Sequence, residues 1–195
     1  MKQNNEEYYN ELMKEKEKKQ FEEWTGLKCS EVLFDSNVDS WSIDTSVFND
    51  RIIGKKQLIF LIEDEDGEKF GYYLNTEVIE KYWNYRDPPK ETDEKSFKFN
   101  IQSNGRLEQP IKFEIKDLKF GGYQLFEKSD GRLIALGDIE LYKENLKMGS
   151  HCTQFEDKFD YHGIENALCG KVGCALPELV GEFFTPKRIL VIQMQ

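Results

Sequence analysis

A continuous apolar run, followed by an acidic turn that ends in glycine, constrains the fold of this chain more than any other feature. The run Gln57–Ile62 is apolar from its second residue onward, and after the turn Glu63-Asp64-Glu65-Asp66-Gly67 a second run follows at Lys69–Leu74. Two such runs joined by an Asp-Gly turn predict a β-hairpin. Because the first run has no polar alternation, we expect it to be buried on both faces, in the centre of its sheet.

Further short strands are expected along the rest of the chain. Turn signals at Asn104-Gly105, Gly121-Gly122 and Asp130-Gly131 separate them. Many short strands at near-regular spacing favour a mainly β (α+β) fold, a two-sheet antiparallel β-sandwich flanked by short helices or else a distorted barrel, over a parallel α/β sheet. The predicted strands are Ser30–Phe34, Ser96–Ile101, Ile111–Ile115, Gly122–Phe126, Leu133–Leu136, Ile139–Tyr142 and Ile189–Gln195.

Helix-forming residues without Gly or Pro predict an N-terminal helix over Asn4–Trp24, which ends before Gly26. Its apolar positions do not sustain a heptad pattern, so we expect a solvated helix attached through Phe21 and Trp24, and little loss of stability when residues 1–20 are deleted. We therefore divide the chain into a charged helix over residues 1–26 and a β-sandwich domain over residues 27–195. Two shorter helices are predicted at Ser46–Ile53 and Thr76–Tyr85.

The charge balance argues against binding to polyanions. The chain has 27 Lys+Arg against 37 Asp+Glu, a formal net charge of -10. Direct binding to nucleic acid or to anionic lipid is disfavoured on these grounds. The longest apolar run, Leu58–Ile62, is too short to cross a membrane, and Met1–Gln20 holds no apolar signal-peptide core. We expect a cytoplasmic protein, with the nucleus as an alternative location.

Cysteine and histidine residues are the first candidates for chemistry. Without a signal peptide, reduced thiols are expected rather than disulfides. The spacing does not repeat a C-x2-C knuckle, so no metal site is predicted. As a nucleophile and base, Cys152 and His151 fail because neighbours on a strand point to opposite faces, and for Cys152 with His162 no third group is identifiable. The residues considered are Cys29, Cys152, Cys169, Cys174, His151 and His162.

Two other patterns were weighed as binding sites. Asp35, Asn37 and Asp39 have the spacing of the first ligands of a calcium loop, but Ser40 and Ser46 stand where glycine and a bidentate glutamate are required, so a polar connection with Asx turns is the better interpretation. No nucleotide, flavin or zincin motif is present, and no cofactor is expected.

Aromatic residues in predicted loops leave a carbohydrate-binding or small-hydrolase sandwich open as an alternative, because aromatic rings stack on sugars and the carboxylates are many. We favour the interpretation that these rings are half-buried cover. They are Trp41, Tyr82, Trp83 and Tyr85.

The densest acidic cluster is Glu63, Asp64, Glu65 and Asp66, at the tip of the first hairpin. Such a turn is usually only solvated. As a hypothesis, it is a docking surface for a basic protein partner, because a hairpin tip on a rigid sandwich presents charge well.

The order of several short segments resembles the TLDc domain family across residues 30–195. The apolar strand, the acidic glycine turn and the Phe-Gly-x-aromatic box are similar to the family's succession of motifs. The matching segments are Leu33-Phe34-Asp35-Ser36, Leu58–Asp64 with Gly67, Phe70-Gly71-Tyr72-Tyr73, Ser96-Phe97-Lys98-Phe99 and Gly149–Phe155.

The resemblance implies a two-sheet β-sandwich without a bound cofactor. It also implies a non-catalytic protein-interaction module, associated with the oxidative-stress response and with regulation of the vacuolar proton pump through its subunits. No catalytic mechanism is established for that family, so no catalytic residue is carried over. A transcriptional co-regulator, recruited by other proteins, is the remaining alternative.

Overall fold

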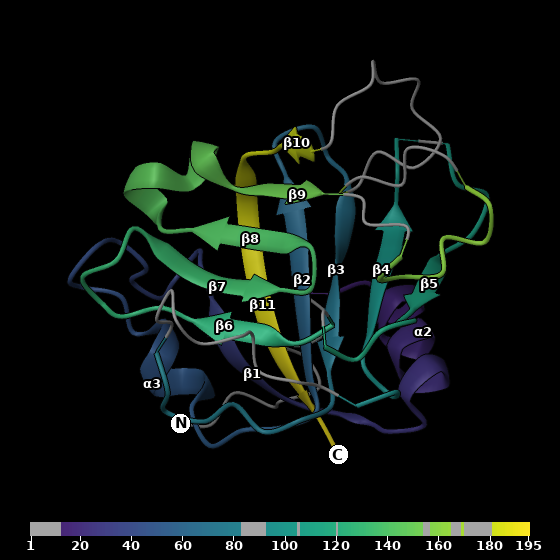
Figure 1. Ribbon diagram of the computed structural model, residues 1–195, viewed down its shortest axis with the longest axis horizontal. Helices are drawn as coiled ribbons and strands as arrows, with labels where there is room; N and C mark the ends of the chain where they lie inside the picture. The colour runs from purple at the N-terminus through teal and green to yellow at the C-terminus, as the bar shows by residue number, and fades with distance from the viewer. Residues whose placement is uncertain are drawn as a thin grey trace.

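Two antiparallel β-sheets face each other in the computed structural model, which describes residues 13–82, 93–104, 106–119, 121–153, 157–164, 169 and 181–195. The large sheet has the order β1-β11-β2-β3-β4-β5 and the small sheet the order β10-β9-β8-β7-β6 (Figure 1). The predicted two-sheet antiparallel sandwich is confirmed. The elements are α2 Glu15–Thr25, β1 Cys29–Asp35, α3 Phe48–Ile52, β2 Leu58–Asp64, β3 Lys69–Leu74, β4 Phe97–Gln102, β5 Ile111–Glu114, β6 Tyr123–Leu125, β7 Arg132–Leu136, β8 Ile139–Tyr142, the 3-10 helix η1 Glu144–Gly149, β9 His151–Thr153, β10 Gly181–Phe183 and β11 Pro186–Met194.

The central position of β2 explains its uninterrupted apolar sequence. It lies between β11 and β3 in the large sheet. Alternate side chains, such as Phe60 and Ile62, enter the core between the sheets, while Ile59 and Leu61 enter a second core on the outer face of the large sheet. The prediction that this strand is buried on both faces is confirmed.

The β2–β3 hairpin forms as predicted, with Glu63 paired to Lys69 across the turn. Gly67 in the turn has a φ of 80°, a conformation that glycine adopts without steric cost. Gly71 on β3 is needed for a different reason: a Cβ atom there would lie 1.8 Å from the carbonyl oxygen of Phe60. The glycine of the Phe-Gly-x-aromatic box therefore permits close approach of two backbones.

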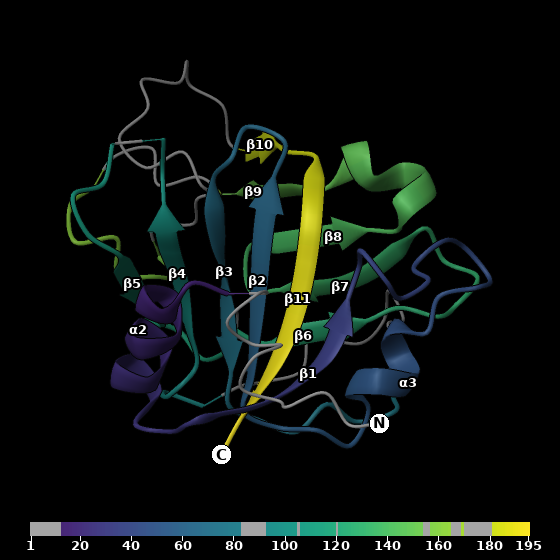
Figure 2. The same ribbon diagram turned by 180° about the vertical axis from the view of Figure 1, so that it is seen from behind.

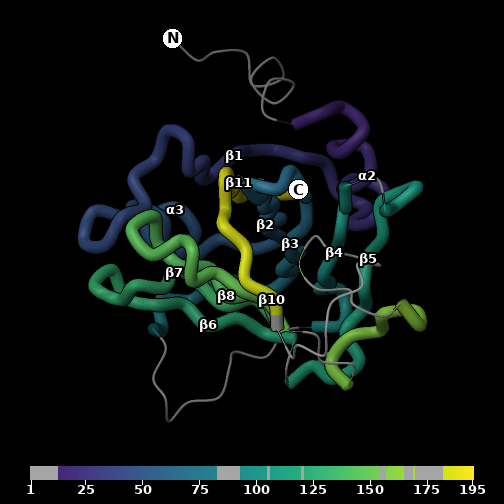
Figure 3. The backbone as a smooth tube through the Cα atoms, turned by 90° about the horizontal axis from the view of Figure 1, so that it is seen from above, coloured from purple at the N-terminus to yellow at the C-terminus, as the bar shows by residue number. Residues whose placement is uncertain are grey.

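The C-terminal strand β11 completes the large sheet. It runs between β1 and β2, with Ile192 opposite both Val32 and Ile59 (Figure 2). Viewed from above, the sheets form two layers, and the chain passes from the small sheet to the large one between β10 and β11 (Figure 3). Strands far apart in sequence thus form the middle of the sandwich.

Helix α2 packs on the outer face of the large sheet, in front of β4 and β5 (Figure 2). Phe21 is fully buried there, with its ring 5.1 Å from that of Phe99, and Trp24 packs edge-on against Phe97 at 5.9 Å. Gly26 caps the helix with a φ of 71°, as its position in the sequence predicts. The start predicted at Asn4 lies outside the described residues.

The attachment of α2 is more extensive than the sequence indicates. Met13 and Glu17 are also buried, and Lys69 Nζ donates a hydrogen bond of 2.8 Å to the Glu17 carboxylate. The helix therefore packs through three turns, and not through Phe21 and Trp24 alone.

The short helix predicted at Ser46–Ile53 is present as α3, with Phe48 and Ile52 fully buried. The ring of Phe48 meets that of Phe34 at 5.1 Å, so α3 closes one margin of the core.

The helix predicted at Thr76–Tyr85 is wrong over residues 76–82, which form an irregular connection. Gly54 N donates to Val78 O at 2.7 Å and Val78 N donates to Lys55 O at 2.8 Å. These long-range bonds take the backbone groups that a helix needs, and Tyr82 forms a bridge with Leu125. Trp83 to Tyr85 lie outside the described residues, as does Gly105 of a predicted turn.

The other predicted strands are confirmed, but β9, β10 and η1 were not predicted from the sequence. Each of the two strands has only three residues, too few to show an alternating pattern. Of the helices that the structure describes, none combines the length and the apolar composition of a membrane span.

Candidate interaction surface

The acidic turn between β2 and β3 presents three of its four predicted residues to solvent. Glu63 is half-buried, and Glu65 and Asp66 are exposed. Asp64 is buried instead, and its Oδ1 accepts a 2.9 Å hydrogen bond from the backbone N–H of Glu68. The turn therefore presents Glu63, Glu65 and Asp66 to solvent, while Asp64 shapes the turn.

Two of these carboxylates form ion pairs with lysine side chains. Lys187 Nζ lies 2.8 Å from Glu63, and Lys147 Nζ lies 3.2 Å from Glu65. Burial alone would raise the pKa of Glu63, but the hydrogen bond from Lys187 and the charge of Lys69 hold that pKa below its ordinary value of 4.5. Glu63 therefore stays ionised at neutral pH.

Backbone hydrogen bonds bring three segments together at this end of the sandwich. Glu65 N donates to Thr185 O at 3.0 Å, and Phe184 N donates to Ser150 O at 2.9 Å. The β2–β3 turn, the β10–β11 connection and the end of η1 are consequently neighbours, as Figure 1 shows at the top of the molecule.

Large apolar side chains are exposed on two of these segments. Leu146 is 48% exposed, Met148 76% and Phe183 67%. Helix η1 buries none of its residues, so it holds Leu146 and Met148 on the outside. A hollow of about 420 Å³ lies between η1 and Tyr142, lined by Tyr142 and residues 144–149, mostly through apolar atoms.

A row of rings continues this apolar region over the outward face of the small sheet. The ring centre of Phe183 on β10 lies 5.5 Å from that of His151 on β9, and the ring centre of His151 lies 6.3 Å from that of Tyr142 on β8. We call this whole region the end surface; it comprises Glu65, Asp66, Tyr142, Leu146, Met148, His151 and Phe183. Glu63 alternates with Ile59 and Leu61 on β2, so it faces the outer side of the large sheet and is not part of the end surface.

A buried ion pair is the most unusual polar feature of the interior. Lys98 on β4 and Asp138 in the β7–β8 turn are both 0% exposed, and Lys98 Nζ lies 2.9 Å from Asp138 Oδ2. The hydroxyl of Tyr161 donates to the same oxygen at 2.6 Å, and its ring packs against Phe113 and Phe159. The pair links β4 of the large sheet to the β7–β8 turn of the small sheet, and it is closed off from solvent.

The prediction of reduced thiols is wrong for two cysteines. Cys152 and Cys169 form a disulfide, with their Cα atoms 5.8 Å apart. The fold brings β9 and residue 169 together inside the core, a proximity that spacing along the chain does not reveal. Cys152 is consequently no thiol nucleophile, and His162 instead lies near Glu114 and Asp160.

Of the other two cysteines, Cys29 has a free thiol, and burial together with the charge of Glu22 raises its pKa to about 11. Cys174 lies outside the described residues, as does Phe155.

The polar connection after β1 has the Asx turn that the sequence predicts, since Asn37 N donates to Asp35 Oδ1 at 3.0 Å. The carboxylate of Asp35 is bound by Arg188 at 2.7 Å, and that of Asp39 by Arg51 at 3.2 Å. Arginine thus occupies the oxygens that a calcium ion would require. Throughout the part of the chain that the structure describes, no three His, Cys, Asp or Glu side chains are grouped to hold a metal.

The loop aromatics do not form a shared stacking platform in the described residues. Trp41 is only 5% exposed and belongs to the core, and Tyr82 packs against the same core. Trp83 and Tyr85 lie outside the described residues.

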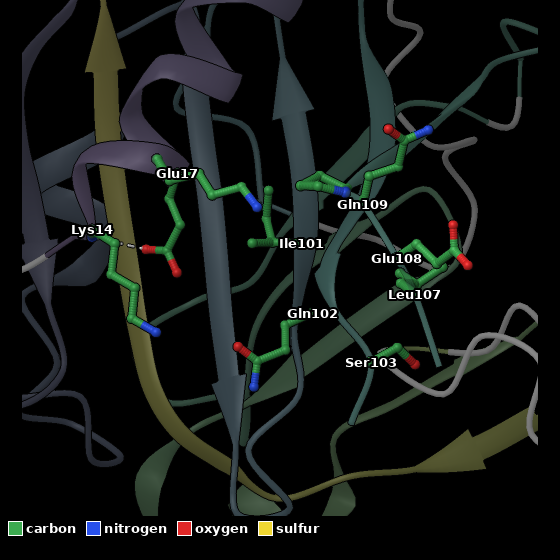
Figure 4. A pocket seen from close by; sticks show the side chains of 10 residues that line it. Lys14, Glu17, Ile101, Gln102, Ser103, Leu107, Glu108 and Gln109 are labelled. Atoms are coloured by element: carbon green, nitrogen blue, oxygen red, sulfur yellow. Dashed lines mark hydrogen bonds between the residues drawn. The ribbon is translucent and has the colours of Figure 1, made fainter. Parts of the chain in front are cut away.

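A second hollow, of about 360 Å³, lies between α2 and the end of β4 (Figure 4). Lys14 and Glu17 line one side, joined by a hydrogen bond from Lys14 N, and Gln102, Ser103 and Glu108 lie across from them. The rim mixes both charges, so it favours neither anionic nor cationic ligands.

The apolar residues of the end surface were not identified from the sequence. A run such as Phe183-Phe184 does not reveal which ring is exposed, and Phe184 is in fact buried. Only the acidic turn gave a local signal. No protein-family model matches this chain, and no curated protein is significantly similar to it.

Proposed function

We propose that this chain is a protein-interaction domain without a catalytic role, and that it binds its partner through the end surface. One observation carries the proposal. Leu146 and Met148 expose large apolar side chains at a hollow, Phe183 is exposed on β10 nearby, and Lys147 of the hollow pairs with Glu65 of the acidic turn. Contiguous apolar surface with a polar rim is typical of protein–protein contact sites.

The shape of the end surface supports a protein partner over a small molecule. Its apolar side chains extend over β10, β9 and β8 as well as η1. Small ligands are usually enclosed in deep clefts, whereas this region is open. The formal net charge of -10 disfavours nucleic acid and anionic membranes as partners.

The resemblance to TLDc domains supplies the biological context of the proposal. On that basis the partner is a subunit of the vacuolar proton pump, and the process is the response to oxidative stress. A cytoplasmic location, which is expected from the sequence, is part of the same proposal. Disulfides are uncommon in that compartment, but Cys152 and Cys169 are both 0% exposed, so soluble reductants have little access to the bond in the folded domain.

The test is affinity purification from cell extract with the full chain as bait, followed by mass spectrometry with pump subunits scored. The variant Met148→Ser/Phe183→Ser should lose partners that the unaltered chain retains. Ile79→Ser is the matched control, because the side chain of Ile79 is apolar and exposed. Its backbone N–H donates a hydrogen bond to the hydroxyl of Tyr123 on β6, at the opposite edge of the small sheet. Equal recovery of every partner by all three proteins would refute the proposal.

A further inference from the structure

The hollow beside η1 has a size and a lining that suit an apolar side chain. It measures about 420 Å³ and is lined by Tyr142, Leu146 and Met148 among others. Met148 is 76% exposed, so its flexible thioether is free to repack around an inserted group. A bulky apolar side chain of a partner fits this chemistry.

The charges around the hollow indicate which charge the partner carries next to its apolar side chain. Three carboxylates lie at or beside it, from Glu65, Asp66 and Glu144, against the ammonium group of Lys147, a local difference of two negative charges. In the pair of Glu65 with Lys147 the two side chains are 59% and 34% exposed, and such solvated pairs are weak. A partner's cation can therefore replace a lysine of this chain without a large cost.

We infer that the end surface binds a protein segment that places one bulky apolar side chain in the hollow beside η1 and Lys or Arg side chains against Glu65 and Asp66. This inference rests on the proposed function and adds the chemistry of the partner.

A second copy of this chain fits the surface poorly. A symmetric contact would set the same patch against itself, and the acidic turns would repel each other. An acidic segment is disfavoured for the same reason. The sign of the local charge therefore selects a basic partner with an apolar anchor.

The test selects peptides from a random phage-displayed library against the immobilised full chain and measures the affinity of the enriched peptides by fluorescence anisotropy. We expect peptides with net positive charge and at least one Leu, Ile, Met, Phe or Trp. Their affinity should fall at least about tenfold in Glu65→Lys/Asp66→Lys and in Met148→Ser/Phe183→Ser. It should also fall with added salt.

The matched control is Glu77→Lys/Glu80→Lys, which reverses two exposed carboxylates in the connection beside β6 and changes the net charge equally. The affinity of the enriched peptides for this control variant should stay within about twofold of their affinity for the unaltered chain. Acidic or neutral peptides, peptides insensitive to the end-surface variants, or no enrichment at all would overturn the inference. The proposed function would still stand in these cases if the purification recovers partners that Met148→Ser/Phe183→Ser loses, and it fails separately if no such partner is found.

Discussion

A single inward-pointing lysine forms an ion pair between the two sheets. On β4, Phe97 and Phe99 face α2, so Lys98 between them faces the space between the sheets and meets Asp138 of the small sheet. A buried charge without its partner is costly, although a complete pair contributes little net stability compared with apolar residues.

Replacing Lys98 by Met should therefore lower the free energy of unfolding by about 3–5 kcal/mol, because the carboxylate of Asp138 is left buried and uncompensated. Urea denaturation measures the loss. The double variant Lys98→Met/Asp138→Asn removes both charges and keeps an acceptor for Tyr161, so it should recover much of the stability. A single variant as stable as the unaltered protein would show that the pair is solvated.

The thiol of Cys29 should react slowly with alkylating reagents. Burial, with Glu22 nearby, raises its pKa from 9.0 to about 11, so the thiolate fraction at neutral pH is lowered roughly a hundredfold. In a Cys174→Ser variant, where Cys29 is the only cysteine besides the disulfide pair, iodoacetamide labelling followed by mass spectrometry gives the rate. The rate should rise about tenfold per pH unit up to about pH 11. Labelling at neutral pH as fast as in the urea-unfolded chain would contradict the burial of this thiol.

At the scale of elements, α2 belongs to the folded domain. The rings of Phe21 and Trp24 cover Phe97 and Phe99 on the outer face of β4. The expectation that residues 1–20 are dispensable does not take account of Met13 and Glu17, which are buried on the same face.

Phe21→Ala should therefore cost about 3–5 kcal/mol of unfolding free energy, the range found for large aromatic side chains removed from a core. Lys19→Ala on the exposed side of α2 is the control and should change stability by less than about 0.5 kcal/mol. Deletion of residues 1–20 should be destabilising as well. If Phe21→Ala and Lys19→Ala behave alike in urea denaturation, the packing of α2 on the large sheet is refuted.

At the scale of the whole molecule, residue 169 connects the two sheets. Its sulfur is bonded to Cys152 in the small sheet, and its carbonyl oxygen accepts a 2.7 Å hydrogen bond from Asn100 Nδ2 in the large sheet. The disulfide closes a loop with a sequence separation of 17 residues. It therefore restricts the unfolded chain as well as the native core.

Loss of this bond should lower stability by about 3 kcal/mol, which corresponds to a melting temperature lower by roughly 6–12 °C for a chain of this size. The comparison is between Cys152→Ala/Cys169→Ala and Cys29→Ala/Cys174→Ala, measured by thermal denaturation. The second variant keeps the bond and should melt close to the unaltered protein. Equal melting temperatures for the two variants would show that the bond contributes nothing.

Local patterns predicted those parts of the fold that depend on near neighbours. The β2–β3 hairpin, the short helix α3 and the cap at Gly26 each depend on a few consecutive residues. The helix predicted at Thr76–Tyr85 was wrong because the backbone of Val78 forms hydrogen bonds with Gly54 and Lys55. These partners are distant in sequence, so a local pattern does not reveal them.

The amino-acid sequence by itself determined the positions along the chain of all the described strands except β9 and β10, the mainly β class and the acidic turn at Glu63–Asp66. Only the tertiary structure decided that β11 lies between β1 and β2, that Cys152 meets Cys169, and that Phe183 is exposed while Phe184 is buried. The physical reason is that a turn or an alternating strand is set by neighbouring side chains. Burial, pairing and exposure depend instead on which distant segments pack together, and the end surface is formed entirely by such distant segments.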